Sequence, residues 1–188
     1  QASRKELNQF MQERVNPNGQ KLTERFRVGD KVICLSNNSY HWQIGSDRQT
    51  KFVANGQLGE IMGQDGKYFE IKLESDGFDD DIVFVDRSKL THDWDLGYAI
   101  SIHKSQGSSW PIVFLVVDES SRARFLGSRQ IIYTGISRAE KYCVTIGKKA
   151  TINQDLRRDA ISDRSTRLVE RLTERIFDDE GNPIWRKV

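Results

Sequence analysis

This chain has 188 residues, enough for one domain of ordinary size or for one domain carrying a smaller one. Its 30% charged and 37% hydrophobic residues exclude a disordered chain, and a net charge of only +2 indicates nothing by itself about nucleic acid. No apolar run approaches the roughly 20 residues that cross a bilayer, so we expect a cytoplasmic protein without a membrane partner. The two cysteines and three histidines are scattered, so we predict neither a metal site nor a disulfide framework.

The charge is unevenly distributed along the chain. Between Ser120 and Lys149 seven basic residues face one acidic residue, whereas the stretch from Glu74 to Asp86 holds six acidic residues and no basic one. A polyanion would be attracted to the first stretch and repelled by the second. Two solvated faces would explain the charges equally well, so the charge distribution alone does not show whether the chain binds a polyanion.

The first third of the chain predicts one helix followed by short strands. Ser3 and Glu6 form a capping box, and Asn16-Pro17-Asn18-Gly19 ends the helix that it starts. Apolar patterning then predicts four strands, with a hairpin turn at Asp65-Gly66. Such closely spaced strands favour a small β-barrel. The strands are predicted over residues 31–35, 57–62, 68–73 and 82–85, and the polar residues 37–50 are expected to form a long exposed loop.

After Leu90 the pattern changes to alternating helices and strands. Two apolar runs indicate strands buried on both faces, and the spacing between them indicates helices. This order is typical of an α/β fold with a mostly parallel sheet covered by helices. Strands are predicted over residues 112–117 and 142–146, helices over 94–104, 129–139, 151–159 and 164–176, and a loose tail over 178–183.

Polar residues gather in two segments of this second part. Ser101, His103, Lys104 and Gln106 lie within six residues and suit phosphates and base edges, while Gly107 lets the backbone approach a ligand closely. A capped helix end with a solvated face would explain the same residues. Arg138 ends an otherwise apolar helix between two strands, where a ligand of an open α/β sheet binds. A surface arginine at a helix C-terminus is the plain alternative.

These two segments resemble motifs V and VI of superfamily 1 helicases, closest to the RecD-like branch. Residues 98–108, YAISIHKSQGS, are similar to that family's Y-A-x-T-x-H-K-x-Q-G-S, and residues 133–139, YTGISRA, to its Y-T-A-x-T-R-A. Residues 26–32, 37–38 and 53–59 resemble the SH3-like barrel that these enzymes insert in the second RecA-like domain, and residues 7–17 resemble the helix that precedes this insertion. The likeness implies half of a P-loop NTPase (RecA-like) domain 2A over residues 1–25 and 91–188, with an SH3-like barrel 2B inserted over 26–90.

The resemblance also implies roles for single residues. Arg138 would be the catalytic arginine finger on the γ-phosphate of ATP. Nucleotide-binding residues would be Gln106, Gly107, Ser109 and Arg138. Residues contacting single-stranded DNA would be Ser101, His103, Lys104, Asn37, Asn38 and Asn55. Ser109 departs from the family pattern, in which a glutamate would bind the nucleotide sugar.

One signature is absent from the sequence. No G-x-x-x-x-G-K-[ST] loop occurs in the 188 residues, so the phosphate cradle and the Mg²⁺ ligands must come from an N-terminal RecA-like domain of the same parent protein. The resemblance therefore implies the C-terminal portion of an ATP-dependent DNA helicase of repair or recombination, inactive alone. Its partners would be single-stranded DNA, that domain, and other nuclease-helicase subunits. The alternative is a non-catalytic DNA- or partner-binding module, for instance in an exodeoxyribonuclease V-type complex.

Overall fold

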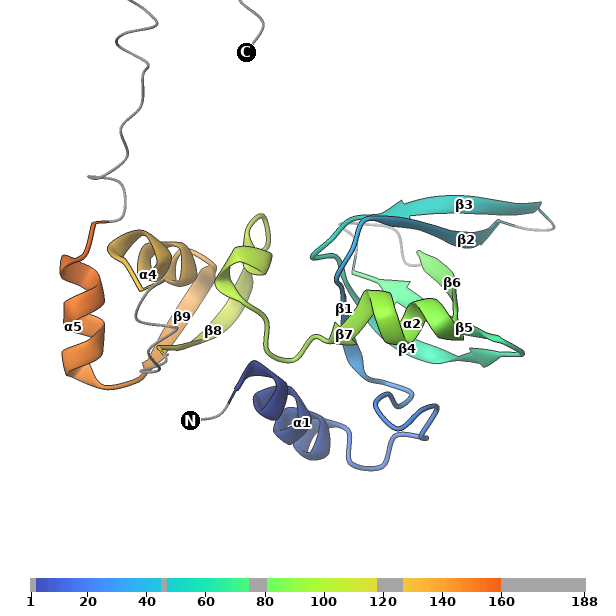
Figure 1. Ribbon diagram of the computed structural model, residues 1–188, viewed down its shortest axis with the longest axis horizontal. Coiled ribbons are helices and arrows are strands. Elements are labelled where there is room, and N and C mark those ends of the chain that lie inside the picture. Colours follow the sequence, from blue (N-terminus) through green and yellow to red (C-terminus); the bar gives the residue numbers. More distant parts are fainter. Residues whose placement is uncertain (1–2, 45–46, 75–80, 118–126, 160–188) are drawn as a thin grey trace, which may run out of the picture.

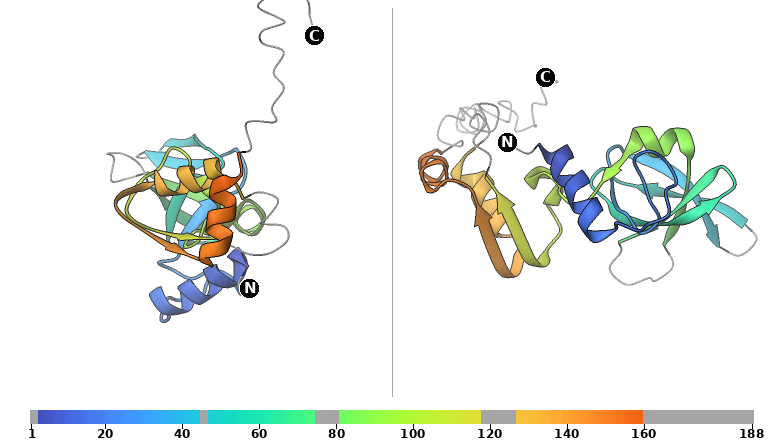
Figure 2. Two further views of the ribbon diagram at one scale, coloured as in Figure 1. Left: turned by 90° about the vertical axis from the view of Figure 1, so that its left-hand side faces the viewer. Right: turned by 90° about the horizontal axis from the view of Figure 1, so that it is seen from below.

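The computed structural model describes residues 3–44, 47–74, 81–117 and 127–159, which form a mixed α/β fold (Figure 1). An antiparallel sheet makes one group of elements, a parallel strand pair with two helices makes the other, and α1 lies beside the segment that joins them (Figures 1 and 2). In chain order the elements are α1 Arg4–Val15, β1 Lys31–Cys34, β2 Asn38–Ile44, β3 Asp47–Val53, β4 Leu58–Asp65, β5 Tyr68–Leu73, β6 Ile82–Asp86, α2 Arg87–Asp93, β7 Trp94–Leu96, the 3₁₀ turn η1 Ile102–Ser105, β8 Trp110–Val116, α4 Arg129–Ile136, β9 Ala139–Ile146 and α5 Lys149–Arg157.

The predicted capping box starts α1. The Ser3 Oγ accepts a hydrogen bond from the Glu6 amide at 3.3 Å, and the Ser3 amide donates to Glu6 Oε2 at 2.6 Å. The helix ends at Val15, with Asn16 as its C-cap, because Pro17 cannot continue it. The buried face of α1 is polar, since it consists of Asn8 and Gln12, while Phe10 is 53% exposed.

Seven strands form one antiparallel sheet in the order β3-β2-β6-β5-β4-β1-β7. The predicted strands at 31–35, 57–62, 68–73 and 82–85 are confirmed as β1, β4, β5 and β6, and the turn after Asp65 joins β4 to β5. Side chains of β5 and β6 alternate between buried and half-buried, as a strand with one face on a core requires. The core includes Phe69, Ile71, Val83 and Trp94, all fully buried.

Three sequence predictions in this group are wrong. Residues 37–50 are not a loop, because β2 and β3 pair as a hairpin from Asn38↔Val53; the polar outer side chains concealed the strand, while Tyr40 is buried. Residues 94–104 are not a helix, because β7 pairs with β1 and η1 follows. The sheet is not closed into a barrel, since among the described residues β3 and β7 form its two edges. Helix α2 was not predicted, although Asp86 caps it through the Ser88 amide.

The second group confirms the parallel prediction. Strands β8 and β9 pair in parallel, with Phe114 opposite Val144, and α4 precedes β9. The helices predicted at 129–139 and 151–159 are found as α4 and α5. The helix predicted at 164–176 and the tail at 178–183 lie outside the described residues.

Burial of this pair on both faces was also predicted, and one face contradicts it. Toward α4, Leu115 is 5% exposed and meets Gly135, where an added Cβ would lie 2.7 Å from Leu115 Cδ1. On the other face Phe114 is 66% exposed and Tyr142 67%. Periodicity alone cannot tell whether a covering layer is present. No helix among the described residues has both the length and the apolar character needed to cross a membrane.

Candidate functional site

The segment that carries the first polar motif is fixed at its start and exposed at its end. The Tyr98 hydroxyl donates to Asp30 Oδ1 at 3.0 Å, and Ala99 exchanges two hydrogen bonds with the Asn8 side chain. Burial, followed by the nearby Asp30 charge, raises the pKa of Tyr98 to about 12. The chain then turns through η1, where the Lys104 amide donates to the Ser101 carbonyl at 2.9 Å.

Gly107 follows this turn in a conformation that favours glycine. Its φ is +90°, and no heavy atom lies within 4 Å of the place where a Cβ would be. The glycine is therefore required by the backbone angle and not by crowding from the protein. The space beside Gly107 is open to a ligand.

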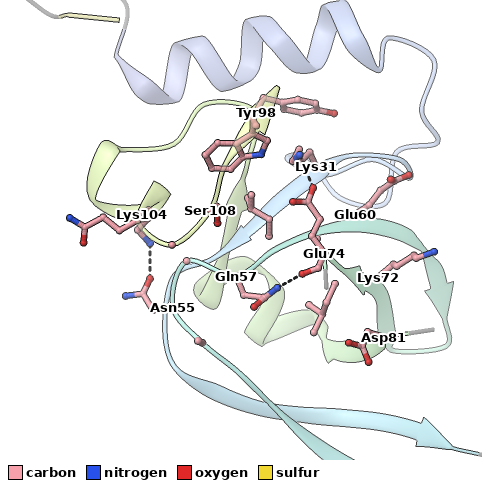
Figure 3. A pocket seen from close by; sticks show the side chains of 18 of the residues that line it. Lys31, Asn55, Gln57, Glu60, Lys72, Glu74, Asp81, Tyr98, Lys104 and Ser108 are labelled. Carbon is pink, nitrogen blue, oxygen red and sulfur yellow. Dashed lines mark hydrogen bonds and ion pairs between the residues drawn. The ribbon is translucent and has the colours of Figure 1, made fainter. Parts of the chain in front are cut away.

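A groove of about 1640 Å³ separates this segment from the antiparallel sheet. Figure 3 shows Lys104 extending across it toward Asn55. Its lining includes lysines 31, 51, 72 and 104 and acids 60, 74, 81 and 140, so the charges nearly balance. Two of these lysines are paired with acids, Lys31 with Glu74 at 2.6 Å and Lys51 with Asp81 at 2.5 Å. Lys104 has no ion pair within the described part of the chain.

Several residues predicted to contact DNA are brought together at this groove. The Lys104 Nζ donates to Asn55 Oδ1 at 2.8 Å, and the Asn55 amide donates to Asn37 Oδ1 at 2.7 Å. Burial, followed by the positive charge of Arg4, lowers the pKa of Lys104. His103 and Ser101 are exposed and line the same groove. Together these side chains offer hydrogen-bond donors and one unpaired cation to a ligand.

Asn38 differs from the other predicted DNA contacts. Its Nδ2 donates to Asp93 Oδ2 at 2.9 Å, beside the Tyr40 hydroxyl, which donates to the same oxygen at 3.1 Å. Burial acts to raise the pKa of Asp93, but hydrogen bonds from His92, Asn38 and Tyr40 hold it below its usual value. The Asn38 amide thus already has a partner within the fold.

The guanidinium of Arg138 lies against the loop that follows η1. Its Nη1 donates to the Ser108 carbonyl at 3.2 Å, its Nε to the Thr134 carbonyl at 3.2 Å, and its Nη2 to the Ser137 hydroxyl at 3.1 Å. Across the described residues no carboxylate forms an ion pair with it. The arginine is half-buried, and the partners of its guanidinium in the structure are neutral oxygen atoms.

The other predicted nucleotide residues lie along the same loop. Gln106 and Ser109 are exposed, and the Ser109 hydroxyl donates to Glu140 Oε1 at 2.7 Å. Trp110, Lys31 and Lys72 also line the groove, and sequence reasoning missed them. The outward alternation of Lys72 in its strand could have indicated one of them. In the described ranges no group of three His, Cys, Asp or Glu residues could hold a metal ion.

Comparison with known proteins gives one family and a small set of relatives. Residues 96–146 match the model of the UvrD-like helicase C-terminal domain, a range that runs from the end of β7 through β9. The chain is 29% identical over 171 residues to the ATP-dependent RecD2 DNA helicase of Deinococcus radiodurans. That match covers 88% of this chain and 21% of the relative. It is also 27% identical over 125 residues to the uncharacterized protein MJ1519 of Methanocaldococcus jannaschii, a match that covers 61% of this chain and 10% of that protein.

The chain therefore spans about a fifth of the first of these relatives and a tenth of the second. Among solved structures, Bacteroides Pif1 helicase in complex with ADP-AlF3 and ssDNA gives a TM-score of 0.39 at 19% identity, covering 69% of this chain and 33% of that one. Two coordinating Pif1 helicases at forked dsDNA give 0.41 at 19% identity, covering 69% of this chain and 31% of that one. These TM-scores are too low to establish a shared fold.

Proposed function

We propose that the chain belongs to the RecD-like superfamily 1 helicases and forms one half of an ATP-driven DNA motor. The match of residues 96–146 to the UvrD-like helicase C-terminal domain and the likeness to RecD2 support this proposal. In this function the groove between η1 and the antiparallel sheet holds single-stranded DNA. The loop from Gln106 to Ser109 and Arg138 face a nucleotide held mainly by another RecA-like domain. The antiparallel sheet serves as the inserted domain 2B, as an open sheet and not as the closed SH3-like barrel that the resemblance implied.

The observation that carries this function is the environment of Arg138. Its guanidinium has five N–H donors, and the three bonds that it makes go to two carbonyls and a hydroxyl. A cation held in place without a carboxylate suits the charge that develops on a transferred phosphoryl group. A pure binding module would need no such group, which favours a motor over the alternative.

The DNA side of the proposal rests on the residues around Lys104. His103, Lys104 and Asn55 face one groove, and their donors suit phosphate oxygens and base edges. Because lysines and acids nearly balance in the lining, the chain alone should bind single strands weakly. Binding should weaken further as salt rises, since phosphate contacts release counterions.

Of the implied cofactors, ATP fits the residues present and Mg²⁺ does not. Arg138, Gln106 and Gly107 would border the phosphates of ATP, whose hydrolysis supplies the free energy for movement along DNA. The described residues contain no cluster of acids for a metal. We assign the Mg²⁺ ligands and the phosphate-binding loop to the other RecA-like domain, so this chain alone should not hydrolyse ATP.

The test is the substitution of Arg138 in the helicase that would contain this chain. Arg138→Ala should lower DNA-stimulated ATP hydrolysis by about 10³-fold or more, because the transition-state charge loses its cation. Arg138→Lys should recover only a small part of the rate, since a point charge cannot replace the guanidinium fork. Steady-state ATP turnover with saturating single-stranded DNA measures both.

Arg129→Ala is the matched control, because Arg129 lies at the opposite end of α4 and pairs with Asp159 at 2.6 Å. It should leave turnover within about twofold of the unchanged protein, since loss of an exposed ion pair has a small effect. Normal DNA-stimulated turnover in Arg138→Ala would reject the role of the arginine, whereas a parent protein that binds DNA but never hydrolyses ATP would favour the binding-module alternative.

A further inference from the structure

A buried polar network joins α1 to the segment that bears the proposed DNA contacts. Asp30 is fully buried, and its carboxylate accepts four hydrogen bonds. The donors are Gln12 Nε2 at 2.5 Å, Asn16 Nδ2 at 2.8 Å, the Arg27 amide at 2.7 Å and the Tyr98 hydroxyl at 3.0 Å. No cation pairs with Asp30 anywhere in the described ranges, so neutral donors alone satisfy this carboxylate.

A second link lies one residue beyond Tyr98. Asn8, 2% exposed, donates through Nδ2 to the Ala99 carbonyl at 2.9 Å and accepts at Oδ1 from the Ala99 amide at 2.7 Å. The backbone N–H and the backbone carbonyl of Ala99 are thus both paired with the single side chain of Asn8. Two successive residues of the segment, 98 and 99, are held by α1 and by the turn before β1.

The contact of α1 and Asp30 with residues 98 and 99 is made by hydrogen bonds, which restrict position more than apolar packing does. Apolar packing is non-directional and tolerates sliding, whereas hydrogen bonds fix distance and angle. Replacing such a network by apolar residues is often neutral or stabilising, so its presence favours a role in fixing position. Here it fixes where the chain leaves the sheet and enters η1.

The network holds the start of the segment that forms one wall of the groove. Ser101 follows Ala99 by two residues and Lys104 by five, while Asn55 lies in the turn between β3 and β4. Asp30 directly precedes β1, which pairs with β4 in the same sheet. The hydrogen bond from Lys104 Nζ to Asn55 Oδ1, at 2.8 Å, connects the two walls of the groove (Figure 3). Movement of residues 98 and 99 would therefore shift Lys104 relative to Asn55.

We infer that Asp30 and Asn8 are positioning residues, which act through Tyr98 and Ala99 to hold the η1 turn at a fixed place across the groove from Asn55. This inference rests on the proposed function for its purpose, which is a groove preformed for a nucleic acid strand. Preformed contacts avoid the cost of ordering the turn when DNA binds.

Tyr98→Phe is the sharpest variant, because it removes one donor to Asp30 and leaves the other three in place. The amides of Lys104 and Ser105, which donate to the Ser101 carbonyl, should exchange with solvent about fivefold to tenfold faster. Affinity for a single-stranded oligonucleotide should fall about threefold to tenfold, and the salt slope by about one unit, as one phosphate contact is lost. The thermal midpoint should stay within about 2 °C.

Tyr142→Phe is the control, since Tyr142 is 67% exposed on β9, which belongs to the parallel pair and not to the sheet that Asp30 precedes. It should change neither the hydrogen exchange of the Lys104 and Ser105 amides nor the affinity for the single-stranded oligonucleotide. Asn8→Ala is the second variant and should accelerate exchange at the same two amides. Unchanged exchange at Lys104 and Ser105 in both Tyr98→Phe and Asn8→Ala would overturn the inference. So would a Tyr98→Phe protein that loses thermal stability without a local change in exchange.

The two proposals fail in different ways. If the unchanged chain binds no single-stranded DNA at low salt, the proposed function fails, and the exchange rates still decide whether Asp30 and Asn8 hold the turn. If the unchanged chain binds and Tyr98→Phe keeps the same affinity and salt slope, positioning by the network is rejected while the proposed function stands.

Discussion

The antiparallel sheet and the parallel pair β8–β9 differ in how completely they are covered. In the first, Phe69, Ile71 and Val83 have no exposed surface and contribute to one continuous core. In the second, one face is left open, and its six large apolar side chains are 44–67% exposed. They are Ile112, Phe114, Val116, Tyr142, Val144 and Ile146.

The comparison shows that an apolar strand sequence does not guarantee a covered strand. Parallel strands are ordinarily buried on both faces, because helices cover each side of the sheet. Among the described residues, the core of the antiparallel sheet draws on residues 22–98. The second group buries two large hydrophobic side chains, Leu115 and Ile132, and packs Gly135 against Leu115. In the proposed function, the open face belongs to the interior of a larger RecA-like layer.

The largest expected effect is on the core of the antiparallel sheet. Phe69→Ala should destabilise the chain by about 3–5 kcal/mol, because it leaves a cavity in a core that cannot collapse freely. Urea unfolding followed by tryptophan fluorescence measures the change. A loss below about 1 kcal/mol would mean that this core is not the stable part of the molecule.

A smaller and pH-dependent effect is expected at Asp93, which links β2 to α2. Its pKa is lowered in the folded chain, so its contribution to stability is present above the unfolded pKa of about 4 and is lost as pH falls through the folded value. Asp93→Asn should cost about 1–3 kcal/mol at pH 7, since Asn38 and Tyr40 lose a charged acceptor.

Urea midpoints of the two proteins, measured from pH 7 down to pH 2.5, test this prediction. The difference between them should shrink as the solution becomes acidic. A constant difference across this range would show that the Asp93 carboxylate does not stabilise the fold through its charge.

A close contact between α4 and β8 gives the next prediction. Gly135→Ala would place a methyl group 2.7 Å from Leu115 Cδ1, which forces a shift between α4 and β8. Overpacking of this kind costs about 1–3 kcal/mol, and the better helix propensity of alanine returns up to about 1 kcal/mol. We expect a net loss of about 1 kcal/mol in urea unfolding. A stabilised variant would mean that α4 does not press on β8 in solution.

The smallest effect is expected on the open face. Phe114→Thr keeps a residue suited to a strand and removes an exposed ring, so unfolding free energy should change by about 0.5 kcal/mol or less. Solubility should rise, because the variant reduces an apolar surface patch. A loss comparable to that of Phe69→Ala would show that something covers this face and would remove the contrast between the two regions.

Local patterns in the sequence predicted much of the fold. The capping box of α1, the alternating strand β5 and the parallel order of β8 and β9 depend on spacing within a few residues, and all three are confirmed. The wrong secondary-structure predictions concern β2, β3 and β7, where pairing with distant strands outweighed local polarity or helical spacing. The closed barrel and the covered second face of β8–β9 were also predicted wrongly, because both depend on how distant elements pack.

The sequence could name candidate site residues, but it could not predict the hydrogen bonds that hold their segment in place. Ser101, His103, Lys104 and Arg138 were identified from two short segments that resemble known motifs. The bonds from Asn8 to Ala99 and from Asp30 to Tyr98 span 91 and 68 positions, and no periodicity in the sequence encodes such pairs. The engagement of Asn38 by Asp93 likewise depends on a partner 55 positions away.

The central claim is that Arg138 contacts the phosphoryl group of a nucleotide bound beside Gly107. The most direct measurement compares the affinity of the DNA-bound parent helicase for ADP alone and for ADP with aluminium fluoride, which mimics the phosphoryl group in transfer. Arg138→Ala should keep the affinity for ADP within about threefold and lose about 10²-fold or more for the mimic. Equal affinity of the variant and the unchanged protein for the mimic would contradict the claim.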